Sequence, residues 1–131
     1  MKKVAFVCVH NSCRSQMAEG FAKAYGSGII DVYSAGTENY PEIKPLAKQV
    51  MEEIGISLDD QYPKTLDDMP VTDILITMGC EANCPWVPNE FQEDWGLEDP
   101  TGKGIEAFRT TRELIKHKVL ELIERIQTNT L

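Results

Sequence analysis

The chain has 131 residues, of which 42% are apolar and 26% charged, an ordinary composition for one globular domain with one core. The net charge of −8 argues against nucleic acid as a partner, because phosphate backbones bind basic surfaces. No apolar run approaches the ~18 residues of a membrane span, and the first residues lack the ~7–15-residue apolar stretch of a secretory signal. We therefore expect one domain over residues 1–131, cytoplasmic and monomeric, without a nucleic-acid or membrane partner.

The charge is distributed unevenly along the chain. Residues 1–65 carry seven Lys/Arg and eight Asp/Glu, whereas residues 66–131 carry six and thirteen. The stretch 90–99 contains five carboxylates and no basic residue. An anion-binding site is therefore expected in the first half, and the late acidic stretch is expected to be solvated surface with one working carboxylate.

Strand and helix patterns alternate from the start of the chain. Residues 4–7 form a continuous apolar run that predicts a fully buried strand. Residues 15–25 have helical spacing, and residues 29–34 predict a second strand. The inward positions expected on this first helix are Met17, Phe21 and Ala24.

The same alternation continues to the end of the chain. Pro45 suits the first turn of a helix that Gly55 ends, and its apolar positions are Leu46, Val50, Met51 and Ile54. Residues 73–78 predict a third buried strand and residues 93–97 a short fourth one. The last helix has one apolar face formed by Ile105, Phe108, Ile115, Val119, Leu122 and Ile126. This order predicts an α/β fold with a parallel sheet and helices on its faces.

A polar loop follows the first predicted strand. Cys8 stands where this strand ends, and the next helix opens near Ser15. Ligands bind at the carboxyl edge of an open parallel sheet, where a tight loop before a helix directs N–H groups and the helix dipole inward. Arg14 adds a planar, permanent charge that suits a tetrahedral oxyanion. The Cys-x5-Arg-Ser pattern therefore predicts an anion site with a nucleophilic Cys8 thiolate at its floor.

Each residue of this loop also has a plainer interpretation. A cysteine at a strand end is often only a small buried hydrophobe, which is the interpretation we favour for Cys13 but not for Cys8. His10 either steers the anion or is simply exposed, and Asn11 suits a left-handed turn that its side chain ties together. The cysteine spacings miss the two-residue gap of zinc knuckles, so no metal site is predicted.

The sequence resembles a known family over nearly its whole length. The matching stretches are FVCVHNSCRSQMAEGFAKAYG, VYSAGT, MEEIGIS, DILITMGCEANCP, EDWGLEDPTGKG and FRTTREL. They resemble the arsenate reductases that share the fold of low-molecular-weight tyrosine phosphatases. What sets these stretches apart from the phosphatase branch is Ser-Gln-Met-Ala-Glu after Arg14 and the extra cysteines in the 79–85 segment.

The resemblance implies a fold and an activity. The fold is three-layered, with a four-stranded, open, twisted parallel sheet and helices on both faces. The activity is reduction of arsenate to arsenite in arsenic detoxification, with no cofactor and with phosphate or sulfate as competing anions. The oxyanion-binding residues implied are His10, Asn11, Ser12, Cys13, Arg14 and Ser15.

The resemblance also implies a relay of three cysteines. Cys8 attacks arsenate, Cys80 attacks the Cys8–arsenic adduct, and Cys84 then forms a Cys80–Cys84 disulfide for an external reductant. Thioredoxin is the expected reductant. Only three residues separate Cys80 from Cys84, a shorter gap than thioredoxin-coupled members have, so a glutaredoxin or a low-molecular-weight thiol is the other candidate.

Asp99 follows the last predicted strand. The resemblance implies that it protonates the leaving group, as the Asp-Pro of the phosphatase branch does, whereas its plainer interpretation is a turn before Pro100. Phosphatases place aromatic residues next, but here Thr101 and Gly102 follow. A phosphatase acting through Cys8, Arg14 and Asp99 is therefore the alternative function, and an oxidisable, non-catalytic anion-binding module is a third. 

Some relatives hold a potassium ion beside the loop. Asn11, Glu19 and Ser34 match three of its ligands, and Lys64 stands where the fourth, an aspartate, is found. A lysine ammonium there replaces the cation, so we expect no potassium requirement.

Overall fold

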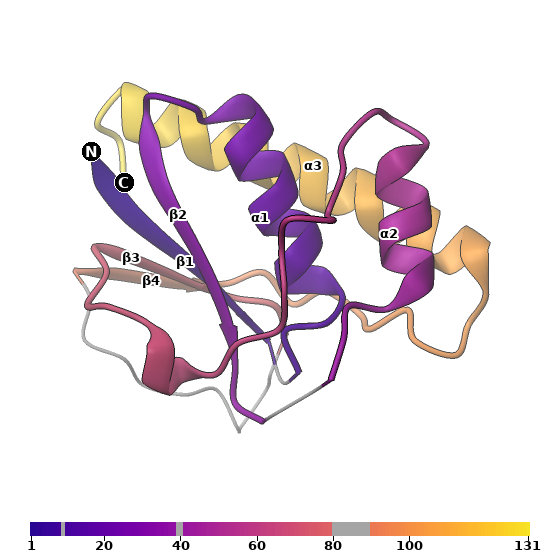
Figure 1. The fold of residues 1–131 in the computed structure, drawn as a ribbon. Coiled ribbons are helices and arrows are strands. Elements are labelled where there is room, and N and C mark those ends of the chain that lie inside the picture. The colour runs from indigo at the N-terminus through magenta and orange to yellow at the C-terminus, as the bar shows by residue number, and fades with distance from the viewer. Residues whose placement is uncertain (9, 39–40, 80–89) are drawn as a thin grey trace.

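The computed structural model describes residues 1–8, 10–38, 41–79 and 90–131 (Figure 1). In chain order its elements are β1 (Lys2–Cys8), α1 (Arg14–Tyr25), β2 (Ile30–Gly36), α2 (Pro45–Glu52), the 3-10 helix η1 (Leu66–Asp68), β3 (Ile74–Thr77), β4 (Phe91–Asp94) and α3 (Ile105–Gln127). The four strands form one parallel sheet in the order β2-β1-β3-β4. The predicted α/β fold with a four-stranded parallel sheet is confirmed.

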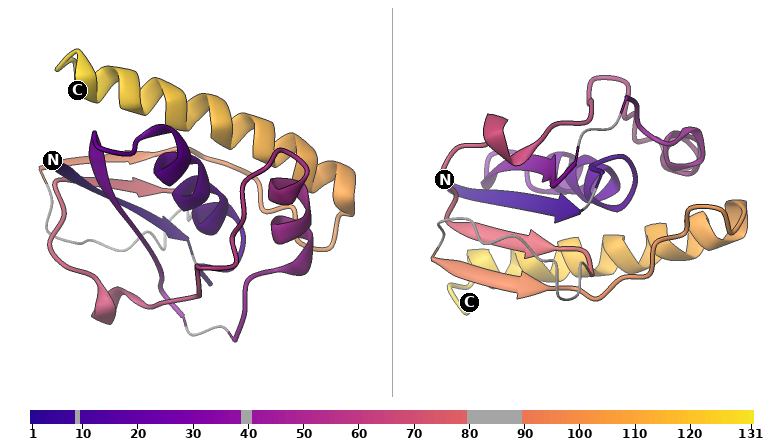
Figure 2. Two further views of the ribbon diagram at one scale, coloured as in Figure 1. Left: turned by 45° about the horizontal axis from the view of Figure 1, so that its top comes forward. Right: turned by 90° about the horizontal axis from the view of Figure 1, so that it is seen from below.

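Two layers of different thickness cover the sheet. α1 and α3 lie along one face, and α2 packs against both of them (Figures 1 and 2). Val4 and Phe6 of β1 point into the large core on this face, whereas Ala5 and Val7 point to the other face, and all four are fully buried. On that second face the described residues supply η1, whose Leu66 packs on the smaller cluster. The helical cover is therefore much heavier on one side.

The fourth strand begins and ends earlier than predicted. Residues 93–97 read as a strand because Trp95 and Leu97 are apolar and two apart, but β4 ends at Asp94. Both side chains are buried, yet Gly96 has φ +61° between them and breaks the extended backbone. Trp95 instead packs its ring against Phe6, with the ring centroids 5.7 Å apart.

The helices bury slightly different faces from those expected. Met17 and Phe21 are fully buried on α1, but Ala24 near its end is exposed. Ile54 is 38% exposed because α2 ends at Glu52 and the chain turns before it. The apolar face predicted for α3 is confirmed, and its fully buried members include Phe108, Ile115, Val119 and Leu122.

The carboxyl ends of the strands meet at the end of the molecule opposite the two termini (Figure 2). The end of β1 and the loop after it are each held there by a backbone hydrogen bond. The Lys44 N–H, just before α2, donates to the Ser12 carbonyl at 2.8 Å, and the Met78 N–H, after β3, donates to the Val7 carbonyl at 3.1 Å. Among the described residues, no helix has the length and apolar character needed to cross a membrane.

Gly79, two residues after β3, lies close to the backbone of Leu97. Its φ is +95°, and a Cβ there would lie 2.8 Å from the Leu97 carbonyl oxygen and 3.0 Å from the Leu97 nitrogen. Gly55 has φ +81° but nothing within 4 Å of a Cβ. We predict that Gly79→Ala lowers the free energy of unfolding by about 3 kcal/mol or more, against about 1 kcal/mol for Gly55→Ala. Urea unfolding measures both, and equal losses would show that the contact with Leu97 is unimportant.

Candidate active site

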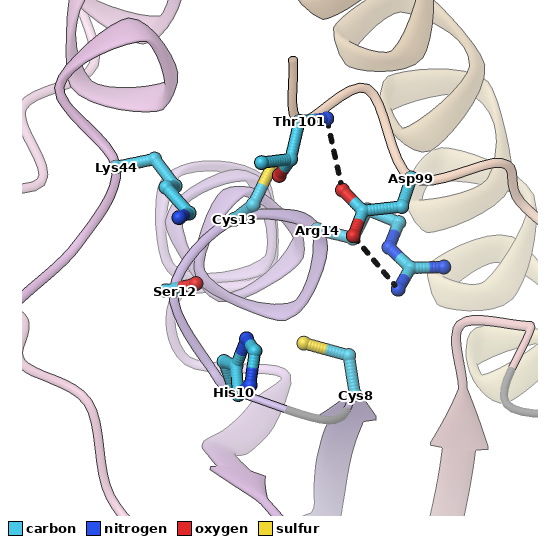
Figure 3. A pocket seen from close by; sticks show the side chains of 8 residues that line it. All are labelled: Cys8, His10, Ser12, Cys13, Arg14, Lys44, Asp99 and Thr101. Atoms are coloured by element: carbon cyan, nitrogen blue, oxygen red, sulfur yellow. Dashed lines mark hydrogen bonds and ion pairs between the residues drawn. The ribbon is translucent and has the colours of Figure 1, made fainter. Parts of the chain in front are cut away.

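A pocket of about 270 Å³ lies at the N-terminus of α1 (Figure 3). Its lining consists of Cys8, His10, Ser12, Cys13, Arg14, Lys44, Asp99 and Thr101. The volume is below the ~300–1,000 Å³ of sites for drug-sized ligands. The described lining contains no phenylalanine, tyrosine or tryptophan, and it combines two cations with the N-terminus of a helix. The small volume, the two cations and the helix N-terminus suit a small anion.

Cys8 lies at the floor of the pocket, and its sulfur points toward the interior (Figure 3). Cys8 is 5% exposed, and its Sγ lies 2.8 Å from the Ser15 Oγ. Asn11 is fully buried, has the left-handed φ of +53° expected from the sequence, and donates its Nδ2–H to the Ser15 Oγ at 2.8 Å. A hydroxyl that donates to sulfur stabilises the thiolate, the form of a cysteine that attacks.

Arg14 is held by backbone carbonyls from two other strand ends. Its Nη1 donates to the Met78 carbonyl, after β3, and to the Leu97 carbonyl, after β4, the second at 2.7 Å. Its Nη2 lies 3.9 Å from the Asp99 Oδ2. The Arg14 side chain is only 9% exposed. These hydrogen-bond and charge partners offset the cost of burying its positive charge. One end of the guanidinium is thus fixed, and the pocket lies beside it.

Asp99 reaches the pocket from the segment after β4, as predicted. Burial would raise the pKa of Asp99, but hydrogen bonds from the backbone and side chain of Thr101 and the charges of Arg14 and Lys44 outweigh it. The pKa of Asp99 therefore lies below its usual value. The Thr101 N–H donates to the Asp99 Oδ1 at 3.0 Å. At neutral pH the free protein carries Asp99 as a carboxylate, which is the wrong form for a general acid until an anion binds beside it.

Cys13 also lines the pocket but differs from Cys8 in character. It is 4% exposed, and burial raises the pKa of its thiol far above the ordinary value. The negative charges of Asp99 and Cys8 raise it further, and the cations Arg14 and Lys44 only partly oppose them. Cys13 therefore stays a neutral thiol, consistent with the packing role favoured from the sequence.

Two pocket residues were missed by the sequence reasoning. Lys44 precedes α2, and Thr101 directly follows the Asp-Pro pair. The position before Pro45 marks a helix start, which could have directed attention to Lys44, but nothing in the sequence brings that helix start to the loop after β1. His10 lies at the rim, with its Nε2 3.3 Å from the Glu38 Oε2. 

Ser12 and Ser15 complete the predicted loop. Ser12 lines the pocket and is 4% exposed, while Ser15 is fully buried beneath it and bonded to Cys8 as described. All six residues expected to bind the oxyanion are therefore at this end of the molecule, although Asn11 and Ser15 lie behind the lining rather than in it.

The residues matched to potassium ligands do not fit that cation. Glu19 is 4% exposed, the Ser34 hydroxyl donates to it, and the Lys64 Nζ lies 3.7 Å from its Oε1. Lys23 donates to the other carboxylate oxygen at 2.5 Å. Two ammonium groups thus balance the one carboxylate. In the part of the chain that the structure describes, no cluster of three metal-binding side chains occurs.

Cys80 and Cys84 lie outside the described residues. Gly79, the last described residue before them, lines a second hollow of about 460 Å³ together with Arg14 and Asp99. The Gly79 N–H donates to the Asp94 Oδ1 at 2.8 Å, and the Thr77 hydroxyl donates to the same oxygen at 2.7 Å. The chain therefore leaves β3 toward Cys80 from a fixed point next to the anion pocket.

Comparisons with known proteins agree with this geometry. The family model described as low molecular weight phosphotyrosine protein phosphatase matches residues 3–131. The chain is 47% identical to the glutaredoxin arsenate reductase of Synechocystis sp., covering 96% of this chain and 99% of that protein. It is 38% identical to arsenate reductase 1 of Staphylococcus epidermidis, covering 95% and 98%. A solved structure of an arsenate reductase in the phosphate-binding state has a TM-score of 0.89 and 47% identity, covering 96% and 99%.

The lowered pKa of Asp99 predicts a pH dependence of stability. A carboxyl with a depressed pKa in the folded state stabilises the protein above its unfolded pKa, and this contribution is lost as the pH falls through the folded value. Asp99→Asn should therefore be less stable than the wild type at pH 7, and this gap should shrink as the pH falls from the ordinary Asp pKa of about 3.9 through the lower folded value. The gap should be under about 1 kcal/mol, because 53% of the Asp99 side chain is exposed. Chemical denaturation at several pH values from about 7 down to about 2 measures this gap, and a gap that does not shrink as the pH falls below about 4 would contradict the assignment.

The Lys64–Glu19 pair predicts indifference to potassium. The wild type should melt at the same temperature in potassium chloride and in sodium chloride. Lys64→Asp, which replaces the ammonium by a carboxylate, should melt lower in sodium and recover in potassium. Lys64→Met is the control, and it should lose about 1–2 kcal/mol in both salts because Glu19 keeps only Lys23 as a cationic partner. A wild type stabilised by potassium beyond sodium would refute the replacement.

Proposed function

The chain belongs to the low molecular weight phosphotyrosine protein phosphatase family, and we propose that it reduces arsenate to arsenite by a relay of Cys8, Cys80 and Cys84. The observation that carries the proposal is the double role of Arg14. Its guanidinium borders the same pocket as the Cys8 sulfur and bonds the carbonyl of Met78, two residues before Cys80. The anion site is therefore bonded to the chain that directly precedes the other two cysteines in the sequence.

The first step is formation of a sulfur–arsenic bond. The Cys8 thiolate attacks the arsenic atom of an arsenate anion held at the N-terminus of α1 beside Arg14 and Lys44. An arsenic–oxygen bond breaks, and the oxygen leaves as water once it has gained protons. Arsenic remains As(V) in the adduct. The Ser15 hydroxyl, 2.8 Å from the Cys8 sulfur, stabilises the thiolate before the attack.

The second and third steps move two electrons and then regenerate Cys8. The Cys80 thiolate attacks the Cys8 sulfur, so the sulfur–arsenic electron pair passes to arsenic, arsenite leaves, and a Cys8–Cys80 disulfide forms. The Cys84 thiolate then attacks Cys80, which frees Cys8 and leaves a Cys80–Cys84 disulfide. An external dithiol or thiol reduces that bond. Cys13 takes no part, since burial keeps its thiol neutral.

We propose a glutaredoxin with glutathione as the physiological reductant, ahead of the thioredoxin expected from the sequence. Support comes from the relative at 47% identity, which is named a glutaredoxin arsenate reductase. The short Cys80–Cys84 gap agrees with a departure from the thioredoxin-coupled pattern. The proposed compartment is the cytoplasm, where thiols are kept reduced.

A coupled assay tests the relay. Purified protein is incubated with arsenate, glutaredoxin, glutathione, glutathione reductase and NADPH, and in parallel with thioredoxin, thioredoxin reductase and NADPH. We expect arsenate-dependent loss of NADPH that falls by about 100-fold or more in Cys80→Ser and in Cys84→Ser, as loss of a nucleophile does. Cys84→Ser should still release one arsenite per molecule and retain a Cys8–Cys80 disulfide, detectable by mass spectrometry.

A chromogenic phosphate ester is the matched control in the same experiment. The relay predicts that weak ester hydrolysis survives in Cys80→Ser and Cys84→Ser, because phosphate resembles arsenate and needs only the Cys8 pocket. Strong ester hydrolysis in all variants, without arsenate-dependent NADPH loss, would make the protein a phosphatase that uses Cys8, Arg14 and Asp99.

A further inference from the structure

A chain of hydrogen-bonded side chains runs from the protein surface to the Cys8 sulfur. Gln61 Nε2 donates to Gln16 Oε1 at 2.8 Å, and Gln16 Nε2 donates to Asn11 Oδ1 at 2.9 Å. Asn11 Nδ2 donates to Ser15 Oγ, and Ser15 contacts Cys8. Gln16, Asn11 and Ser15 are all fully buried, whereas Gln61 is half-buried. Gln61 and Gln16 have no role in the thiol relay.

Backbone groups fix the orientation of every amide in this chain. Lys64 N–H can only donate, so the Asn11 atom 2.9 Å from it is the oxygen, and the nitrogen must face Ser15. Gln16 Nε2 lies 2.9 Å from the carbonyls of Asn11 and Tyr62, which can only accept. Gln61 Nε2 likewise lies 2.9 Å from the Gln16 carbonyl. The direction of donation is therefore the same at each link, toward Cys8.

This direction matters for the nucleophile. Because Asn11 donates to Ser15, the Ser15 hydrogen remains available for the Cys8 sulfur. If the Asn11 amide were turned over, its oxygen would face Ser15 and compete for that hydrogen. A thiolate cannot donate in return, so it would lose its hydroxyl partner. Gln16 adds a second donor at the Asn11 oxygen and so opposes this turn.

We propose that Gln16, supported by Gln61, is a positioning residue that aims the Ser15 hydroxyl at the Cys8 thiolate. Gln16 lies in the Ser-Gln-Met-Ala-Glu stretch that sets this sequence apart, and the thiol relay gives Gln16 itself no role. It touches neither the pocket nor Cys8 and acts through Asn11 and Ser15. The inference rests on Cys8 as the nucleophile, and alkylation reports this directly, without arsenate turnover.

The reactivity of Cys8 at low pH tests the role. Cys8 is alkylated with iodoacetamide at pH 6 and at pH 9.5 in a Cys80→Ser, Cys84→Ser background, and the modified peptide is quantified by mass spectrometry. The charged and titratable groups around Cys8 are His10, Cys13, Arg14, Lys44 and Asp99, and the substitutions leave all of them in place.

Gln16→Met removes the donor at similar volume. We expect the pH 6 to pH 9.5 rate ratio to fall by about tenfold, the effect of weakening a hydrogen bond to a charged group. Gln16→Glu should lower the ratio further, because its carboxylate faces three oxygens and favours the turned Asn11 amide. Val50→Ala, a core change in α2, is the stability control and should leave the ratio unchanged.

Gln61 keeps the test decisive if the Gln16 variants fail to fold. Gln61→Glu places a carboxylate against Gln16 Oε1 and should lower the ratio in the same direction, whereas Gln61→Met should lower it less. If the Gln16 variants fold, an unchanged rate ratio in them would overturn the proposal. If the Gln16 variants do not fold, an unchanged rate ratio in both Gln61 variants would overturn it. A fall of equal size in Val50→Ala would overturn it as well, because the effect would then follow stability rather than the chain of donors.

Discussion

The site depends on the hydrogen bonds that the buried guanidinium of Arg14 makes to two backbone carbonyls. Arg14 belongs to the first turn of α1, yet its Nη1 bonds the Met78 carbonyl after β3 and the Leu97 carbonyl after β4. A buried cation needs such partners, because water no longer solvates it. Its burial therefore draws together three segments distant in the sequence. These are the loop that holds Cys8, the chain that leads to Cys80 and the chain that leads to Asp99.

Electrostatics then sets the protonation of the ionisable groups that line this pocket. The protein carries a net charge of −8, but its pocket places Arg14, Lys44 and a helix N-terminus around a small volume. Asp99 stays ionised there because Thr101 and the two cations outweigh its burial. Cys13 meets the opposite balance, since burial dominates and keeps its thiol protonated. The sulfur of Cys8, five residues before Cys13, instead contacts the Ser15 hydroxyl at 2.8 Å.

Much of the fold and part of the site could be predicted from the sequence. The buried run before Cys8 and the apolar face of α3 are periodic signals, and both were confirmed. Trp95 and Leu97 misled the prediction of β4, because burial in a turn and burial in a strand leave the same two-residue spacing. Lys44 escaped notice because its place in the pocket depends on the packing of α2 against the loop after β1.

The sequence by itself determined the chemistry that is available: a cysteine and an arginine framing a loop between a buried strand and a helix. Short-range spacing is enough for that, because the loop and the helix start are local structures. Only the tertiary structure decided which distant groups surround them. Arg14 against Met78 and Leu97, Lys64 against Glu19, and the donor chain from Gln61 to Cys8 all join segments that meet only when the sheet and its helices close.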